Sequence, residues 1–479
     1  MTTVSNPTAG QQPVSVASSS SAGAAGGSVI DVSSLVSELV AATEAPQQGL
    51  ISQETQSVST QISALGTLKS ALSTFQSSLT PLNNPSAFDL QTATSSSPTT
   101  FTATAASGAV QGTYSITVGQ LAQAEQLRST VFAGGGSATV GTGTLSVSLG
   151  GSSFNVSVNS ANDTLSGIAA AINSAAGNPG VTATVLTGAN GAYLLLSSSQ
   201  TGAANTISVT ETDGGTGLSA LTYGTGNTAN YTQVTAPQDA EFTIAGIAAT
   251  SPSNTVTDAI GGVTLSLLAT NAAPATLTVG NDTATIESNI ASFVAAYNTL
   301  VGSFGTLGSY DATTNTAGPM MGNAVLTGIQ NQVGNALYSV VNTGSSTYNT
   351  LASVGITTNS DGTLSLNQTT LSSALATNFS AVSQLFSSQS GVAASLDSTI
   401  TSALGPNGAV TADSQTLVSQ ENALTQQTNQ LNTQMAALTA SMTQEYSALN
   451  TLLSSLQTTS SYLTQAFASL PQVQGSPNA

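Results

Sequence analysis

Residues 413–470 read DSQTLVSQENALTQQTNQLNTQMAALTASMTQEYSALNTLLSSLQTTSSYLTQAFASL, and this stretch decides the fold. Leucine and methionine recur in it at heptad spacing, which is typical of a long helix that packs against another helix. One row contains Leu417, Leu424, Leu431, Leu438 and Leu452, and the other contains Met435, Met442, Leu449, Leu456 and Leu463. At about 1.5 Å per residue, such a helix is on the order of 80 Å long.

A matching pattern lies near the N-terminus. Ile51, Val58, Leu65, Leu72 and Leu79 repeat at heptad spacing in a helix expected from about Gln47 to Leu82. We predict that the two ends of the chain pair as a coiled-coil-like stalk. An ordinary core-facing helix is the alternative for the N-terminal run.

A shorter helix is expected just before this run. Its apolar residues at helical spacing are Val32, Leu35, Val36, Leu39 and Val40. Asp31 is a suitable N-cap, and Pro46 is expected to separate this helix from the longer one because proline interrupts helical hydrogen bonding.

The middle of the chain changes to a period of two, which is typical of β-strands. The clearest unit has the order ββαββ and predicts a small α+β domain. Its expected elements are strands Gly143–Leu149 and Ser153–Val158, helix Thr164–Ala175, and strands Val181–Leu186 and Ala192–Ser198. Further strands are expected at Glu241–Ile247, Gly262–Leu268 and Thr363–Leu366, and further helices at Thr283–Phe304, Met321–Val341 and Leu371–Phe386.

The predicted fold is therefore an α+β multidomain chain in which paired terminal helices carry inserted β-rich head domains. The predicted divisions are a disordered export segment at 1–28, a terminal helix at 29–46, a helical stalk at 47–90 and 281–470, a β-rich head at 91–280 with the ββαββ unit at about 140–210, and a disordered tail at 471–479.

The charge balance excludes several classes of function. The chain has 2 basic residues, Lys69 and Arg128, against 20 acidic ones. Nucleic-acid binding needs a cluster of cations, and attachment to an anionic membrane surface is disfavoured for the same reason. No apolar run approaches the ~18 residues of a membrane span, so membrane insertion is not expected. Residues 1–28 lack the basic and apolar regions of a cleavable secretory signal.

The residue types also argue against an enzyme. Without Cys or His, Ser–His–Asp and Cys–His catalysis and Cys/His zinc sites are impossible. Asp239 and Glu241 could in principle act as a glycosidase pair, but they read more simply as a solvated strand edge. Asn359–Gly362 reads as a hairpin turn rather than a calcium loop. We expect no catalytic, metal-binding or cofactor-binding residues.

One charge interrupts the leucine rows, because Glu445 occupies a leucine position of the heptad. A charge in a helix seam lowers stability but can define register or oligomeric state. The alternative is that the row slips at this point and Glu445 faces solvent.

Several segments together resemble the flagellar hook-associated protein 2 family of filament cap proteins. The motifs are Asp31–Val36 with Glu44–Pro46, Gly112–Val118 with Gln120–Ala124, the ββαββ unit, Asn254–Ile260 with Gly262–Leu265, Phe293–Asn298, Gly355–Ile356 with Asp361–Leu366, and Leu385–Phe386. The resemblance covers about residues 29–470. Two departures are Val29-Ile30-Asp31, where the family has Gly-Leu-Asp, and the near absence of the charged residues usual in the family's stalk.

The resemblance implies a secreted structural cap at the distal tip of the bacterial flagellum. It implies a homo-oligomer near a pentamer, with a tetramer or hexamer as alternatives. Terminal helices would act as legs, and head domains would cover the emerging flagellin while it folds and inserts. The implied partners are flagellin, the hook–filament junction protein and an export chaperone. Another axial flagellar protein, such as the junction protein, or a secreted adhesin that binds surface glycans are the alternative functions.

The residues expected to carry helix packing and oligomerisation lie in the terminal helices. They are Val32, Leu35, Val36, Leu39, Ile51, Val58, Leu65, Leu72, Leu417, Leu424, Leu431, Met435, Leu438, Met442, Leu449, Leu452, Leu456 and Leu463. With so few charged residues, leucine and methionine packing must hold these helices together.

Overall fold

The computed structural model describes residues 31–212 and 217–469. The expected disordered segments at 1–28 and 471–479 lie outside the described residues. The chain divides into two compact units. The first contains described residues 31–69, Leu307–Val325 and 404–469, and the second contains Ser70–Thr306 and Leu326–Ala403. The predicted α+β multidomain class is confirmed, since long helices and several β-sheets alternate along the chain.

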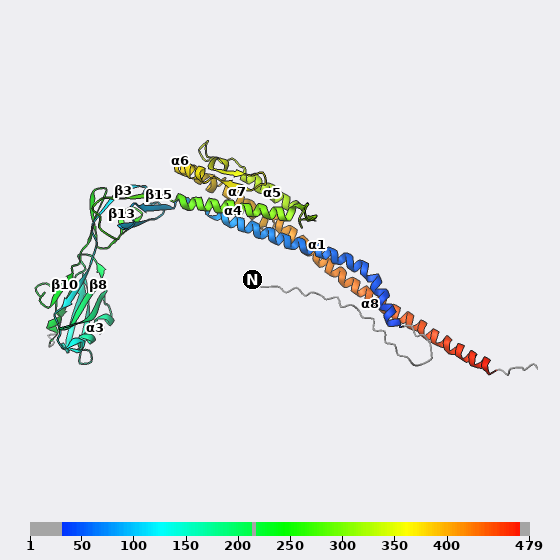
Figure 1. The fold of residues 1–479 in the computed structure, drawn as a ribbon, viewed down its shortest axis with the longest axis horizontal. Helices are drawn as coiled ribbons and strands as arrows, with labels where there is room; N and C mark the ends of the chain where they lie inside the picture. The colour runs from blue at the N-terminus through cyan, green and yellow to red at the C-terminus, as the bar shows by residue number, and fades with distance from the viewer. Residues whose placement is uncertain (1–30, 213–216, 470–479) are drawn as a thin grey trace, which may run out of the picture. The chain divides into compact units, whose positions relative to one another are not determined.

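The first unit is built on the two terminal helices. Helix α1 spans Val32–Asn83, and its part up to Lys69 belongs to this unit. The predicted break at Pro46 is wrong, because α1 continues through it as one helix of 52 residues. Figure 1 shows the N-terminal part of α1, in dark blue, bent away from the line of the rest. A proline removes one helical hydrogen bond and bends a helix without necessarily ending it.

Helix α8 spans Ala409–Ala468 and is 60 residues long, so the predicted long C-terminal helix begins four residues earlier than the expected Asp413. Its N-cap is Gly408. Within the first unit α1 and α8 run side by side, and the C-terminal end of α8 extends beyond α1 (Figure 1). A small hairpin, β16 (Tyr310–Asp311) and β17 (Thr316–Ala317), completes this unit.

The second unit contains the other helices. They are α2 (Pro85–Phe88), α3 (Leu165–Ser174), α4 (Thr283–Gly308, which runs into the first unit), α5 (Ala324–Leu337), α6 (Gln368–Ser387) and α7 (Val392–Leu404, which also ends in the first unit). The sequence interpretation missed α7. Aromatic rings join three helices, since Phe293 of α4 lies 5.7 Å from Phe75 of α1 and 6.3 Å from Phe386 of α6, between ring centroids.

Helix α4 is the one described helix long and apolar enough, by length and composition, to cross a membrane. Its apolar side chains are occupied within the protein. Ile290, Phe293 and Leu300 are each at most 1% exposed. This burial is what a helix at the centre of a protein core requires.

One β-rich core of the second unit lies between two sheets. The five-stranded sheet has the order β1-β15-β3-β11-β12, and the three-stranded sheet has the order β13-β14-β2. The strands are β1 (Gln91–Ser95), β2 (Phe101–Ala105), β3 (Gly112–Gln120), β11 (Ala240–Ile244), β12 (Ile247–Ser251), β13 (Thr255–Ile260), β14 (Val263–Leu267) and β15 (Ala275–Asn281). Alternate residues such as Ile116, Leu265 and Leu277 are fully buried between the sheets.

The second β-rich core contains α3 and two more sheets, β10-β4-β8-β7 and β6-β5-β9. The strands are β4 (Ala124–Ser129), β5 (Gly143–Leu149), β6 (Ser152–Val158), β7 (Val181–Gly188), β8 (Gly191–Thr201), β9 (Ile207–Glu211) and β10 (Tyr231–Thr235). The predicted ββαββ order is present. Its two hairpins, however, belong to different sheets, so the unit becomes a closed core only with β4, β9 and β10.

The predicted strand Glu241–Ile247 is wrong, because a turn divides it. Ala245 and Gly246 have φ values of 51° and 82° and connect β11 to β12. Two residues of positive φ match the twist of a tight hairpin. Alanine rarely adopts this conformation, and the sequence therefore did not mark the turn.

A short hairpin and several short 3-10 helices complete the second unit. Strands β18 (Ile356–Thr358) and β19 (Leu364–Leu366) form a hairpin. The predicted strand Thr363–Leu366 corresponds to β19, and its partner β18 was not predicted. Short 3-10 helices lie at Gly135–Ser137, Leu218–Leu221 and Ala352–Val354.

Candidate assembly surfaces

Two grooves define how α1 and α8 pair in the first unit. Residues Gln47 to Glu54 of α1 share one groove with Gln427 to Gln434 of α8. Residues Val32 to Glu44 share another with Thr439 to Ser447. As the α1 numbers fall the α8 numbers rise, so the pair is antiparallel.

The heptad rows meet in this antiparallel register. Ile51 and Leu431 line the same groove. A step of one heptad along both helices brings Val58 toward Leu424, and another brings Leu65 toward Leu417. All four of these side chains are at most 6% exposed. The predicted pairing of the chain ends is therefore built from leucine and valine rather than from charges.

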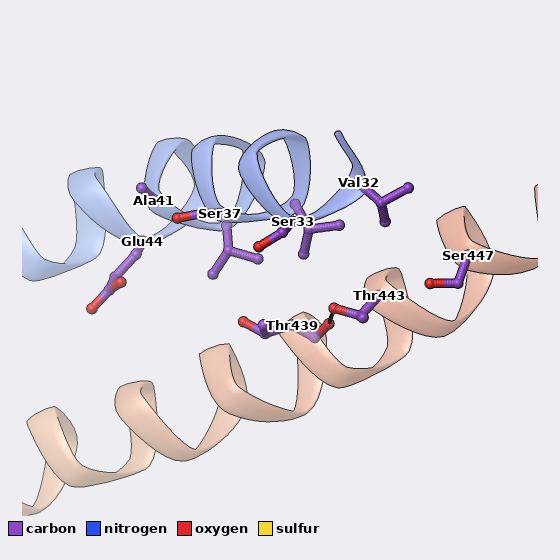
Figure 2. A pocket seen from close by; sticks show the side chains of 10 residues that line it. Val32, Ser33, Ser37, Ala41, Glu44, Thr439, Thr443 and Ser447 are labelled. Atoms are coloured by element: carbon purple, nitrogen blue, oxygen red, sulfur yellow. Dashed lines mark hydrogen bonds between the residues drawn. The ribbon is translucent and has the colours of Figure 1, made fainter. Parts of the chain in front are cut away.

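The groove nearest the start of α1 is incompletely filled, as Figure 2 shows. It has a volume of about 520 Å³. From α1 it is lined by valines and small residues, and from α8 by Thr439, Thr443 and Ser447. Glu44 lies at one end of it. The short hydroxyl side chains of α8 leave this space partly unfilled, although Val36 and Val40 are buried beside it.

Beyond this groove α8 continues without α1. About 20 residues follow Ser447, a length of roughly 30 Å of helix. Leu449, Leu452, Leu456 and Leu463 are 45%, 56%, 58% and 50% exposed. Tyr462 and Phe467 are 72% and 70% exposed. We call residues 449–467 the α8 extension. It carries exposed leucine and aromatic side chains among serine, threonine, glutamine and asparagine, and no charged side chain.

The predicted packing residues therefore fall into three groups. Those buried within the protein are Val36, Val58, Leu65, Leu72, Leu417, Leu424 and Leu431. Those partly buried are Val32, Ile51, Met435, Leu438 and Met442. Those exposed are Leu35, Leu39, Leu449, Leu452, Leu456 and Leu463. The predicted packing set omitted Leu68 and Val410, and also Val40 although it was placed in the expected terminal helix; all three are buried.

Glu445 is exposed, while the next residue, Tyr446, is partly buried. The buried face of α8 passes from Leu438 to Met442 and Tyr446 in steps of four. Steps of four turn the face away from the strict heptad row. Within the single chain the row slips at Glu445, as the solvent-facing interpretation expects.

Threonine hydroxyls of α8 bond to their own helix. Thr443, Thr451 and Thr458, among others, donate to the carbonyl oxygen four residues earlier. Each hydroxyl is thereby satisfied without a partner protein, and the methyl group remains as the free part of the side chain. The α8 surface is consequently less polar than its threonine content suggests.

Two of the carboxylates, Asp239 and Glu125, make structural contacts. The Asp239 Oδ1 accepts the Ala203 N–H at 2.7 Å, which is a structural contact. Glu125 is buried and accepts hydrogen bonds from the Ile207 N–H and the Gln233 Nε2. Among residues 31–212 and 217–469, no group of three metal-ligating side chains converges. Hydrogen bonds from Thr363 lower the pKa of Asp361, which holds the turn of the β18–β19 hairpin.

Two asparagines join the sequence motifs to one another in space. The Asn298 Oδ1 accepts the Leu364 N–H at 2.7 Å, and its Nδ2 donates to the Leu364 carbonyl at 2.9 Å. Asn254 makes the same pair of bonds with the Ala122 N–H and carbonyl, at 2.8 and 2.9 Å. Each side chain replaces one rung of a β-ladder. The motifs Phe293–Asn298 and Asp361–Leu366 are thus one structural feature.

An antiparallel pair of terminal helices around inserted β-rich domains defines an assembly protein with a helical stalk. Comparison with known proteins identifies the group. The sequence model of the flagellar hook-associated protein 2 C-terminus matches residues 237–458, and that of its N-terminus matches residues 28–125. A flagellin hook IN motif matches residues 144–200. The chain belongs to the flagellar hook-associated protein 2 family, and the expected resemblance is confirmed.

Individual relatives agree with this assignment. Flagellar hook-associated protein 2 of Escherichia coli K12 is 34% identical over 332 residues, which are 67% of this chain and 70% of the relative. The B-type flagellar hook-associated protein 2 of Pseudomonas aeruginosa is 34% identical over 285 residues, and the aligned part spans 60% of its length. The crystal structure of the flagellar cap protein FliD D1-D2-D3 domains from Escherichia coli is similar with a TM-score of 0.59 and 33% identity, covering 74% of this chain and 99% of that one.

Proposed function

We propose that this protein is the structural cap at the distal end of the bacterial flagellar filament. In that role it promotes folding and insertion of exported flagellin and is required for filament elongation. The observation that carries the proposal is that both halves of the chain match the same family and one solved flagellar cap protein is covered almost completely. The matches do not favour the junction-protein or adhesin alternatives.

The proposed mechanism requires no covalent chemistry. Flagellin that leaves the export channel unfolded is confined under the head domains until it folds. The terminal helices act as legs that rest on the growing filament. Support comes from the carboxylates, which are used structurally or scattered, and from the absence of His and Cys.

The legs are proposed to need partners outside the single chain. The α8 extension exposes five leucines that an isolated helix in water would not keep uncovered. The sequence that precedes α1 offers no matching leucine row, because the branched aliphatic residues of 1–31 are Val4, Val14, Val16, Val29 and Ile30, which do not repeat at heptad spacing. Because these residues do not match the leucines of the α8 extension, we propose that the extension is covered by neighbouring subunits or by axial proteins of the filament.

The proposed oligomer is a ring near a pentamer, with a tetramer or hexamer as alternatives. The other proposed partners are flagellin, the hook–filament junction protein and an export chaperone. Light scattering of the purified chain gives the subunit number, and negative-stain microscopy displays a ring with legs if the proposal is correct. A strictly monomeric protein at high concentration, with no ring, would count against it.

Deletion of the gene tests the function directly. Cells without the protein should release unpolymerised flagellin into the medium and carry no filaments, and a plasmid copy should restore elongation. A junction-protein role would also prevent filaments, so the position of the protein is determined separately by immunogold labelling, which should mark only the distal tip. Normal filaments combined with failed surface attachment would favour an adhesin.

A further inference from the structure

An apolar hollow lies beside the β18–β19 hairpin of the second unit. Its volume is about 410 Å³. Its floor is made by four buried side chains, Leu337, Leu351, Ile356 and Leu364. Its rim includes Tyr338, which is 62% exposed, and none of the residues that line it carries a charge. A hollow of this size accommodates one or two aliphatic side chains.

The edge of strand β18 borders this hollow. Thr358 lies opposite Leu364 in the antiparallel register, and Asn359 donates its N–H to the Thr363 carbonyl. Because hydrogen-bonded and non-hydrogen-bonded pairs alternate, the N–H and carbonyl of Thr358 point away from β19. Neither group has a hydrogen-bond partner in the part of the chain that the structure describes. Thr358 itself lines the hollow.

The opposite edge of the same hairpin is occupied directly across from Thr358. The outward N–H and carbonyl of Leu364 on β19 are both bonded to the side chain of Asn298. On β18, the outward N–H of Ile356 is taken by the Leu351 carbonyl. The β19 edge is therefore occupied at Leu364, and the N–H of Ile356 is occupied on β18, whereas the N–H and carbonyl of Thr358 remain open beside the hollow.

We propose that the open edge of β18 and the adjoining hollow form a docking site for an extended polypeptide segment that adds as a third strand. Its backbone would bond to Thr358, and one aliphatic side chain would enter the hollow. The identification of the occupant as an unfolded segment of exported flagellin rests on the proposed cap function. Addition of a strand to a free edge is a general mode of peptide recognition.

The chemistry of the site selects the conformation of its occupant rather than its exact sequence. A helix has already used its own N–H and carbonyl groups and cannot satisfy the open rung, whereas an unfolded chain can. The uncharged lining gives no preference for a charged segment. A site of this kind would hold many extended segments weakly and release each one as it folds.

A peptide-binding experiment tests the site in the full-length protein. The probe is a short capped peptide that alternates threonine with valine or leucine and carries a fluorophore for anisotropy. Thr358→Pro removes the free N–H, and Ala352→Phe fills the mouth of the hollow from an exposed position. Each variant should weaken binding by about tenfold, while Ala352→Ser should not.

A second form of the probe distinguishes strand addition from nonspecific hydrophobic binding. The same peptide, N-methylated along the edge that would bond to Thr358, should lose binding, whereas methylation along its other edge should not. Equal binding of both forms would overturn the proposal, and so would undetectable binding by the folded wild-type protein. Circular dichroism and thermal melts confirm that each variant is folded.

The identity of the occupant is tested by cross-linking. Because the chain has no cysteine, Thr357→Cys gives a single attachment point for a photoreactive group on the exposed β18 edge. Flagellin diluted from denaturant should cross-link to it, and Ala352→Phe should suppress the product. Cross-links only between copies of this chain would show that a neighbouring subunit fills the site and overturn the proposal. The deletion phenotype judges the cap function independently.

Discussion

The two parts of α8 have the same sequence pattern and opposite surroundings. In the part beside α1, Leu417, Leu424 and Leu431 are 6%, 4% and 3% exposed. In the α8 extension, Leu452 of the same heptad row and Leu456 and Leu463 of the other row are 50–58% exposed. The pattern shows that a helix has an apolar face, but it does not show whether the partner is in the same chain. We expect the paired part to stabilise the subunit, and we propose the extension as the part available to the assembly.

The largest expected effect is a loss of stability in the paired part. Leu424→Ala should lower the free energy of unfolding by about 2–5 kcal/mol, because it leaves a cavity between α1 and α8. Leu456→Ala, at a half-exposed position, should change it by less than about 0.5 kcal/mol. Urea denaturation followed by far-ultraviolet circular dichroism measures both. Equal losses at the two positions would mean that the extension is also paired within the chain.

The second effect concerns assembly rather than folding. Replacing Leu452, Leu456 and Leu463 together by serine should leave the subunit folded and weaken self-association or filament elongation about a hundredfold, since each leucine contributes on the order of 1 kcal/mol when it becomes fully covered. The matched control replaces the heptad-spaced polar residues Thr451, Thr458 and Gln465 by serine. Light scattering and filament length are the measurements, and a control that assembles as poorly as the test variant would contradict the idea.

How much the sequence could predict differs between local and tertiary features. Strand β5 was predicted with its observed ends, and the helix α3 within one residue at each end, because alternation and the Thr164 N-cap are local signals. The buried row from Val58 to Leu72 followed from heptad spacing. These features depend on residues close together in the chain.

The features that were missed depend on residues far apart or on unusual conformations. The division of the ββαββ unit between two sheets depends on β4 and β10, which pair with each other about 100 residues apart in sequence. Helix α1 continues through Pro46 although proline usually ends a helix. The closed and open edges of the β18–β19 hairpin depend on Asn298, which is 66 residues from its partner Leu364. No short pattern identifies contacts of this kind.

A third prediction places the boundary between the paired and unpaired parts of α8. Glu445→Leu should change the free energy of unfolding by less than about 0.5 kcal/mol, because Glu445 is already exposed. Tyr446→Ala, at the partly buried neighbour, should cost more. The subunit number measured by light scattering should stay the same in Glu445→Leu. A changed number would mean that the charge lies in a seam between subunits and determines register.

The smallest expected effect is that of pH, because neither part of α8 depends on ion pairs. Hydrogen bonds from Thr314 and from Thr363 lower the pKa values of Asp311 and Asp361 below the ordinary 3.8. A lowered pKa means that the two turns are fully stabilised above pH 3.8 and lose this contribution as pH falls through the lowered values.

Thermal melts at pH 7 and pH 4.5 should therefore nearly coincide, and a small decrease should appear only near pH 3 and below. Asp361→Asn, which keeps an acceptor oxygen but cannot ionise, should remove part of that decrease without affecting the α1–α8 pair. A large loss of helical signal already at pH 4.5 would contradict this expectation, because it would mean that carboxylates stabilise the helix pair. Leucine and valine packing would then be insufficient to explain why one part of α8 is buried and the other is left for the assembly.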